Sequence, residues 1–285
     1  MSESPIGLVG VGLLGTALAE RMVAGGLPVL GFDTAKPQLA HLQQLGGRVA
    51  ESLAEVAAAS PVIVLCLPTS AVAQQVVAEL SPGLRRGSSV IDATTGDPED
   101  ARRLQAALAE RGAGYVTATI AGSSEQARRG EAVAIVGASD GDLAAAERVL
   151  ATWTPRRFFV GTPEQAAQLK LIVNLVLGLN RAVLAEGLSL ARACGVDLQR
   201  TLEVLQASPA YSKAMDTKGL KMIARDYAPQ ARLSQHLKDV CLIRQLASAK
   251  GASVPLSTVH ETLLRKASER GFAQADNSAV IEAFS

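Results

Sequence analysis

Residues 6–22 read IGLVGVGLLGTALAERM and contain a GxGxxG pattern from Gly10 to Gly15. The apolar run before the pattern predicts a strand, and residues 16–24 after it predict a helix. In such a turn Gly10 permits the tight bend, Gly12 lets the backbone approach a pyrophosphate, and Gly15 lets helix and strand pack closely. A helix start also offers N–H groups to phosphates. The predicted cofactor contacts of this turn are Gly10, Gly12, Leu13, Leu14 and Gly15.

An acidic residue stands where a dinucleotide-binding turn needs one. Asp33 ends the next apolar run, 18 residues beyond Gly15. At this position a carboxylate accepts hydrogen bonds from the adenosine ribose and repels a 2′-phosphate. Asp33 therefore favours NAD over NADP, although Lys36 nearby would weaken that discrimination. The alternative is a solvated acid in an ordinary turn.

Overall composition describes an ordinary globular chain. Its 285 residues are 48% hydrophobic and 19% charged, with a net charge of +1. This balance gives no argument for nucleic-acid or membrane partners. Three scattered cysteines form neither a disulfide framework nor a CxxC pair, which suits a reducing compartment. The first residues lack a signal-peptide pattern, and the most apolar runs are too short to cross a bilayer, so we expect a cytoplasmic protein.

The chain changes character near residue 161. Up to that point short β-branched runs alternate with helical patterns, which predicts a mostly parallel sheet covered by helices on both faces. Beyond it only helical patterns follow, and Gly161 and Pro163 mark the change. We therefore expect an α/β fold with a Rossmann dinucleotide-binding domain, residues 1–161. An all-α domain, residues 162–285, follows and is entered by a long interdomain helix.

Two further segments follow predicted strands, "CLPTS" at residues 66–70 and "DATTG" at residues 92–96. Because parallel strands end at one edge of a sheet, both segments are expected where such sheets bind ligands. Leu67 and Pro68 are expected to contact the cofactor near the nicotinamide ribose, and Thr95 to contact it from the second segment.

The long helix contains an unusual polar pair. In "QLKLIVNLVLGLNRAVLAEG", residues 168–187, Lys170 and Asn174 share one helical face in a mostly apolar stretch. Moving an ammonium group toward an apolar interior is costly unless it is compensated. Either Lys170 extends to water, as a lysine at a helix start commonly does, or it points into a site that uses it.

Four stretches taken in order resemble the β-hydroxyacid dehydrogenase family, which includes 3-hydroxyisobutyrate dehydrogenases and tartronate semialdehyde reductases. They are the glycine turn and its flanks, "TATIAGSS", "GTPEQAAQLKLIVN" and "LKDVCLI". The resemblance covers nearly the whole chain and implies hydride transfer between a nicotinamide and a short hydroxy acid.

The resemblance also implies roles for individual residues. Lys170 corresponds to the family's catalytic lysine, and Asn174 to an asparagine that helps to hold the substrate. Lys238 and Asp239 correspond to a Lys-Asp pair of the helical domain, whose lysine reaches cofactor and substrate, and both are expected to contact the substrate. Thr95 corresponds to a cofactor-contacting position.

One stretch departs from the family pattern. Where the family commonly has Asp-Ala-Pro-Val-Ser-Gly-Gly, residues 117–123 read TATIAGS, so the acid, the proline and the serine are replaced. The hydroxyl groups of Ser123 and Ser124 and backbone N–H groups around Gly122 would bind a substrate carboxylate instead. The predicted substrate contacts here are Ala121, Gly122, Ser123 and Ser124.

These residues give one leading hypothesis and two alternatives. The leading one is NAD-dependent interconversion of a small 3-hydroxy acid and its semialdehyde, with Lys170, its pKa lowered by burial beside Lys238, moving the proton. An imine reductase, or a reductase of another acidic carbonyl compound, is the second, and a non-catalytic dinucleotide-binding regulator the third. We expect a homodimer or homotetramer. We expect no metal site, because His236 and His260 lack ligand-like spacing.

Overall fold

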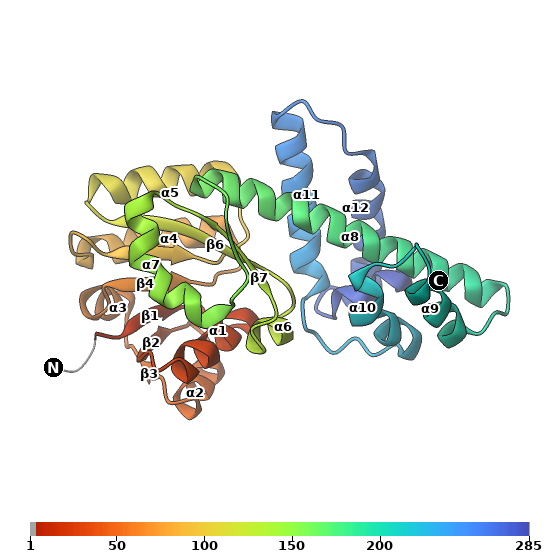
Figure 1. Cartoon of the computed structure of the whole chain (residues 1–285), viewed down its shortest axis with the longest axis horizontal. Coiled ribbons are helices and arrows are strands. Elements are labelled where there is room, and N and C mark those ends of the chain that lie inside the picture. Colours follow the sequence, from red (N-terminus) through yellow and green to blue (C-terminus); the bar gives the residue numbers. More distant parts are fainter. Residues whose placement is uncertain (1–3, 285) are drawn as a thin grey trace. The chain divides into compact units, whose positions relative to one another are not determined.

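A computed structural model describes residues 4–284. The chain divides into two compact units, Met1–Lys170 and Leu171–Ser285, which are coloured red to green and green to blue in Figure 1. The sequence pattern placed the change of character before the long helix. The division into units falls inside that helix instead, after its first two turns.

The first unit is built around one eight-stranded sheet of order β3-β2-β1-β4-β5-β6-β7-β8. All neighbouring strands are parallel except β6 and β7, which pair in the antiparallel sense. The order 3-2-1-4-5 is that of a Rossmann domain, so the predicted fold class is confirmed. The strands are β1 (Ile6–Val9), β2 (Val29–Phe32), β3 (Arg48–Val49), β4 (Val62–Leu65), β5 (Ser89–Asp92), β6 (Gly114–Ala121), β7 (Val133–Gly137) and β8 (Arg157–Phe159).

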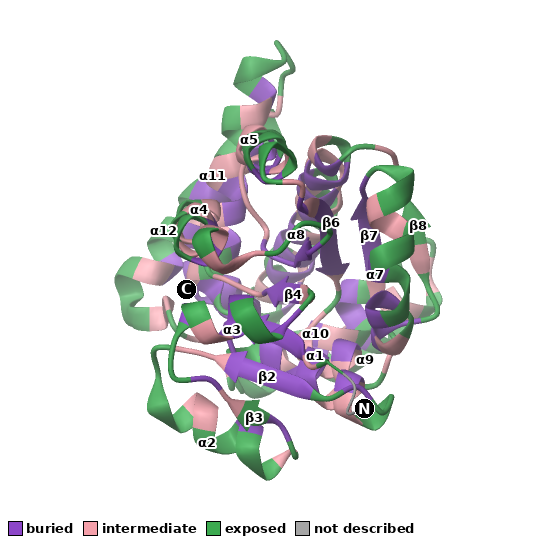
Figure 2. Ribbon diagram, turned by 90° about the vertical axis from the view of Figure 1, so that its left-hand side faces the viewer, coloured by how far each residue is buried: buried purple, intermediate pink, exposed green. Residues whose placement is uncertain are grey.

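Helices cover both faces of this sheet, as expected. Successive residues of a strand point to opposite faces, and Leu8 and Val9 accordingly lie in two different apolar clusters. Figure 2 shows the buried strands between helices whose outer sides are exposed. The helices are α1 (Leu13–Ala24), α2 (Lys36–Gln44), α3 (Leu53–Ala59), α4 (Ser70–Leu80), α5 (Pro98–Glu110), α6 (Ser124–Arg128) and α7 (Asp140–Trp153), with a short 3-10 turn at Ser81–Gly83.

Helix α8 (Pro163–Ala193) has 31 residues and contains the boundary between the two units. An 18-residue window of this helix has a mean hydropathy of 1.5, and 44% of the window is buried inside the structure. Its separate apolar runs are too short for a bilayer, but the continuous helix is long and apolar enough to cross one. This is weak evidence, because the core helix of a soluble protein has the same length and composition.

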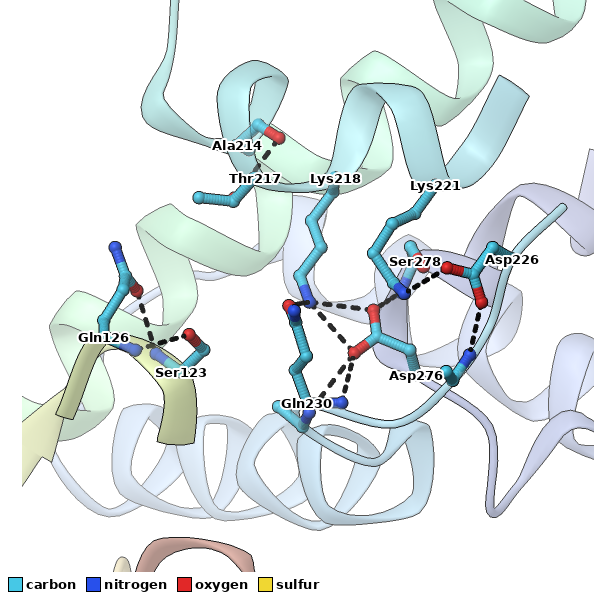
Figure 3. A network of polar contacts seen from close by, with 12 residues as sticks. Ser123, Gln126, Ala214, Thr217, Lys218, Lys221, Asp226, Gln230, Asp276 and Ser278 are labelled. Atoms are coloured by element: carbon cyan, nitrogen blue, oxygen red, sulfur yellow. Dashed lines mark hydrogen bonds and ion pairs between the residues drawn. The ribbon is translucent and has the colours of Figure 1, made fainter. Parts of the chain in front are cut away.

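The second unit is helical, as predicted. Its apolar core includes Leu184 and Leu188 of α8 together with side chains of the following helices. Within it Lys218 forms a buried ion pair with Asp276 at 2.8 Å, and the backbone N–H of Gln230 donates to the same carboxylate (Figure 3). The elements are α9 (Leu198–Ala207), α10 (Lys213–Ala224), α11 (Leu233–Ala249), α12 (Pro255–Ala267), a π-type turn (Ser268–Phe272) and a 3-10 segment (Asn277–Phe284).

Two strands and one helix have little sequence signal of their own. β3 and β8 have two and three residues, too few for an alternating pattern to show. α10 contains Gly219, a poor helix former. A Cβ atom at that position would stand 2.6 Å from Leu202 Cδ1, so packing against α9 accounts for the glycine.

Candidate active site

The glycine turn between β1 and α1 has the geometry that its sequence predicts. Gly10 adopts φ +94°, and a Cβ atom there would lie 2.3 Å from the carbonyl oxygen of Cys66. A Cβ atom at Gly15 would lie 2.0 Å from the carbonyl oxygen of Gly10. Any side chain at either position would therefore displace backbone, which confines both positions to glycine.

The start of α1 fits a phosphate group. Its N-cap is Gly12, which has no side chain to accept hydrogen bonds from the first turn, and that turn contains no acidic residue. A Cβ atom at Gly12 would have no heavy atom within 4 Å, so space is open beside the backbone there. Leu13 and Leu14 begin the helix, and Leu13 is exposed. Open space and first-turn N–H groups together suit a pyrophosphate.

Asp33 follows β2 directly and lies against the glycine turn. Its Oδ2 accepts a hydrogen bond from the backbone N–H of Val11 at 2.7 Å, and its Oδ1 accepts one from Ala35 at 2.8 Å. A carboxylate has about four lone-pair sites, so acceptor capacity remains for a ribose hydroxyl. The structure thus brings Asp33 and residues 10–15 together, as the dinucleotide hypothesis requires.

The loops after β4 and β5 lie at the same edge of the sheet and touch each other. The backbone N–H of Leu67 donates to Thr94 Oγ1 at 3.1 Å. Pro68 is exposed and Thr95 is half-buried, so both can meet a ligand. The loop after β4 lies beside the glycine turn, because a Cβ atom at Gly10 would stand 3.3 Å from Leu67 Cδ2.

The loop after β6 contains the predicted substrate contacts. β6 extends to Ala121, and Gly122 links it to α6. Ser123 is the N-cap of α6: its Oγ accepts from the N–H of Gln126, and its own N–H donates to Gln126 Oε1 at 2.9 Å (Figure 3). The backbone donor of Ser123 is thus engaged within the chain, and we do not count it among those offered to a carboxylate. Ser124 starts the helix and is half-buried.

Lys170 does not extend to water. Its side chain is buried, with 6% of the residue exposed, and its Nζ donates to the carbonyl oxygen of Ile120 at 2.7 Å. Ile120 directly precedes Ala121 and Gly122. The ammonium group therefore lies beside the loop in which the family's substrate stretch occurs. Of the two interpretations left open by the sequence, the structure supports the inward-pointing one.

The helical unit holds the other predicted side chains in one chain of contacts. Asn174 Nδ2 donates to Asp239 Oδ2 at 2.8 Å, and Lys238 Nζ lies 3.1 Å from Asp239 Oδ1. Asn174 and Asp239 are buried, whereas Lys238 is half-buried. Asp239, itself among the predicted substrate contacts, thus engages both Asn174 and Lys238 through its carboxylate.

A buried cationic side chain near Asp239, that of Arg181, was missed by the sequence analysis. Arg181 follows Asn174 by two turns of α8, and its Nε and Nη1 have no hydrogen-bond partner among residues 4–284. Burial lowers its pKa to about 10, and the carboxylates of Asp276 and Asp239 oppose that change. Only a tertiary structure could show this, because helical spacing does not distinguish a buried arginine from a solvated one.

Two histidines pack beside α8. The rings of His236 and His260 lie 5.1 Å apart, and a Cβ atom at Gly178 would stand 2.3 Å from His236 Nε2. Burial, with the nearby charge of Arg181, lowers the pKa of His260 to about 4. Their spacing in the sequence did not predict that the two rings would meet. The described part of the chain contains no group of three His, Cys, Asp or Glu side chains that could hold a metal ion.

Each of the two units matches a known protein family. Residues 5–161 match the family described as the NAD-binding domain of 6-phosphogluconate dehydrogenase. Residues 165–284 match the family described as NAD-binding of NADP-dependent 3-hydroxyisobutyrate dehydrogenase.

Individual relatives match this chain over nearly its full length. 2-(Hydroxymethyl)glutarate dehydrogenase of Eubacterium barkeri is 28% identical, over 97% of this chain and 93% of its own. The structure of 3-hydroxyisobutyrate dehydrogenase from Salmonella typhimurium superposes with a TM-score of 0.91 at 25% identity, covering 98% of this chain and 99% of that chain. The structure of Psf3 in complex with NADP+ and 2-OPP superposes with a TM-score of 0.92 at 25% identity, covering 98% and 100%.

Proposed function

Because the chain belongs to the β-hydroxyacid dehydrogenase family, we propose that it interconverts a small 3-hydroxy acid and its semialdehyde with NAD as cofactor. The observation that carries this proposal is the buried ammonium group of Lys170, 2.7 Å from the carbonyl oxygen of Ile120. A bound nicotinamide would supply the hydride for reduction of the carbonyl carbon.

In the proposed reaction Lys170 handles the proton. As the semialdehyde carbonyl becomes an alcohol, its oxygen gains negative charge and takes a proton from the Lys170 ammonium group. In the oxidative direction the neutral amine takes that proton back. The contact with the Ile120 carbonyl holds the ammonium group in place without neutralising it, because a carbonyl accepts a hydrogen bond and carries no net charge.

Asn174 is proposed to hold the substrate hydroxyl. It lies four residues beyond Lys170, one turn on and on the same face of α8, and its amide is fixed by Asp239. An amide fixed in this way can orient a hydroxyl group without losing rotamer freedom at each binding event. Lys238, held by the same carboxylate, supplies positive charge for an acidic substrate or the cofactor.

NAD is the proposed cofactor because of Asp33. Its carboxylate is fixed beside the glycine turn by Val11 and Ala35, where it would face the adenosine ribose. A 2′-phosphate placed there would meet a like charge with no arginine in the segment from Asp33 to Lys36. Lys36 is the one cation of this short segment.

A homo-oligomer is the proposed assembly. Helix α8 exposes Ile172, Val176, Val183 and Leu190 on its surface, each at more than half of its full accessibility. Exposed apolar side chains that recur on one helix are typical of an interface. Light scattering coupled to size-exclusion chromatography tests this, and a monomer at micromolar concentration contradicts it.

The decisive experiment is a substrate panel assayed with NADH and with NADPH. It should contain short semialdehydes with carboxylate and with sulfonate groups, and cyclic imines. We expect reduction of a carboxylate-bearing semialdehyde with NADH. Reduction of imines alone would favour the alternative reaction, and a strong preference for NADPH would contradict the role given to Asp33. Binding of NADH without turnover of any compound would favour a regulatory protein.

A further inference from the structure

Asp92 is a buried carboxylate that the proposed reaction does not use. It is the last residue of β5, and only 5% of it is exposed. Its Oδ1 accepts from the backbone N–H of Thr94 at 2.8 Å, and its Oδ2 accepts from the hydroxyl of Tyr115 at 2.9 Å. A carboxylate buried at this position is costly to the fold, so an apolar residue would serve packing alone better.

The contacts of Asp92 continue into the predicted cofactor loops. Thr94, fixed through its N–H by Asp92, uses its own Oγ1 to accept from the N–H of Leu67 at 3.1 Å. One carboxylate thereby links the start of β6, the loop after β5 and the loop after β4. The last two loops contain Thr95 and Pro68.

The groups around Asp92 remain neutral donors. Burial, with the charge of Asp92 second, raises the pKa of Tyr115 well above its ordinary value. The same two causes raise the pKa of the Cys66 thiol to about 12. Tyr115 therefore keeps its proton for Asp92, and Cys66 is an inert thiol here.

The space beside this network is too small for a ligand. A cavity of about 10 Å³ is lined by Ser70, Asp92, Thr94, Gly96, Asp97 and Tyr115 among others. A volume of this size corresponds to about one water molecule. Asp92 can therefore act on a cofactor only through the loops that it holds.

We propose that Asp92 is a positioning residue that sets the loops after β4 and β5 for the nicotinamide half of the dinucleotide. This inference rests on the proposed function, since it presupposes a dinucleotide at the sheet edge. The adenosine half would depend on Asp33 and the glycine turn, which lie outside the Asp92 network. Removing a hydrogen bond of the Asp92 network should therefore weaken binding of the nicotinamide half more than binding of the adenosine half.

Three variants of the full chain test this role. Thr94→Val removes the acceptor for Leu67 and keeps the side-chain shape, and Asp92→Asn weakens both contacts of the carboxylate. Ser89→Ala is the matched control, because Ser89 is buried in the same strand and its hydroxyl has no partner among the described residues. For each protein one measures the dissociation constants of NADH and of ADP, which lacks both the nicotinamide and its ribose, together with the melting temperature.

Thr94→Val should raise the dissociation constant of NADH about fivefold, with about a tenfold or larger rise for Asp92→Asn, as expected for lost hydrogen bonds. The dissociation constant of ADP should change by less than about twofold, and Ser89→Ala should resemble the wild type. Equal weakening of both ligands, or no change for NADH, would overturn the positioning role. A wild-type protein that binds neither NADH nor NADPH would instead contradict the proposed function.

Discussion

Asn174 donates a hydrogen bond from Nδ2 to Asp239 Oδ2, 2.8 Å away, and Asp239 Oδ1 lies 3.1 Å from Lys238 Nζ. One buried carboxylate thus orients an amide and an ammonium group at once. This contact uses the amide nitrogen of Asn174 as its donor and does not involve the amide oxygen. The arrangement makes the two proposed substrate contacts dependent on a third residue.

We therefore expect Asp239→Ala to lower kcat/KM by about tenfold or more, because neither Asn174 nor Lys238 keeps its orientation. Asn174→Ala should lower it similarly, and the double variant should lose less than the product of the two single effects. A double-mutant cycle in kcat/KM measures this coupling. Strictly multiplicative losses would show that the contact at 2.8 Å has no part in the reaction.

Lys170→Ala should lower kcat by about 10²- to 10⁴-fold, the usual contribution of a positioned proton donor. The affinity for NADH should stay close to that of the wild type, because the proposed cofactor contacts lie elsewhere. Turnover under saturating substrate and fluorescence titration with NADH separate the two quantities. Lys266→Ala, an exposed lysine of α12, is the control. Unchanged turnover in Lys170→Ala would refute the mechanism.

Asp33→Asn should shift cofactor preference toward NADPH, because it removes the charge that opposes a 2′-phosphate and keeps an acceptor for the Val11 N–H. We expect the ratio of kcat/KM for NADH to that for NADPH to fall by about tenfold, from loss of one like-charge contact. Steady-state kinetics with both cofactors measures it. An unaltered ratio would mean that Asp33 serves only the turn.

Stability should depend on pH through His260, which is 2% exposed and packs beside His236 and Arg181. Its pKa is about 4 in the folded protein against an ordinary value of 6.5. Between these values the unfolded chain binds a proton that the folded chain does not. The free energy of unfolding is therefore highest above pH 6.5 and decreases as the pH is lowered from 6.5 to 4. The loss by pH 4 should reach about 3 kcal/mol.

Denaturant unfolding at a series of pH values measures this loss. His260→Gln should flatten the dependence between pH 6.5 and pH 4, since the proton-binding group is absent. His41→Gln, which alters an exposed histidine of α2, should leave it as in the wild type. Equal slopes for all three proteins would exclude His260 as the cause.

The sequence predicted those parts of the site in which backbone geometry restricts residue choice. A GxGxxG turn between a strand and a helix leaves few alternatives, and the structure confirms the close approaches at Gly10 and Gly15. The fold class followed from the alternation of strand and helix patterns, and the comparisons confirm it. Both the glycine turn and the fold class depend on contacts that are local in sequence or common to all parallel sheets.

Other parts depend on residues that are distant in sequence. The partner of Lys170 is Ile120, 50 residues away, so helical spacing alone left its direction open. Asp92 meets Tyr115 across 23 residues, and the His236–His260 pair joins two helices. Such contacts have no periodicity, because tertiary packing and not the repeat of a helix or strand brings the residues together.

The contacts of Asp33 have a consequence for how this chain could change cofactor in evolution. Its carboxylate satisfies the N–H groups of Val11 and Ala35 besides facing the place proposed for the ribose. A substitution of Asp33 that allows NADPH to bind must therefore also supply an acceptor for those two N–H groups, or both donors are left unsatisfied. Small polar residues meet this demand and apolar ones do not. The accessible route to a new specificity is thus narrow, and it is set by the turn as much as by the nucleotide.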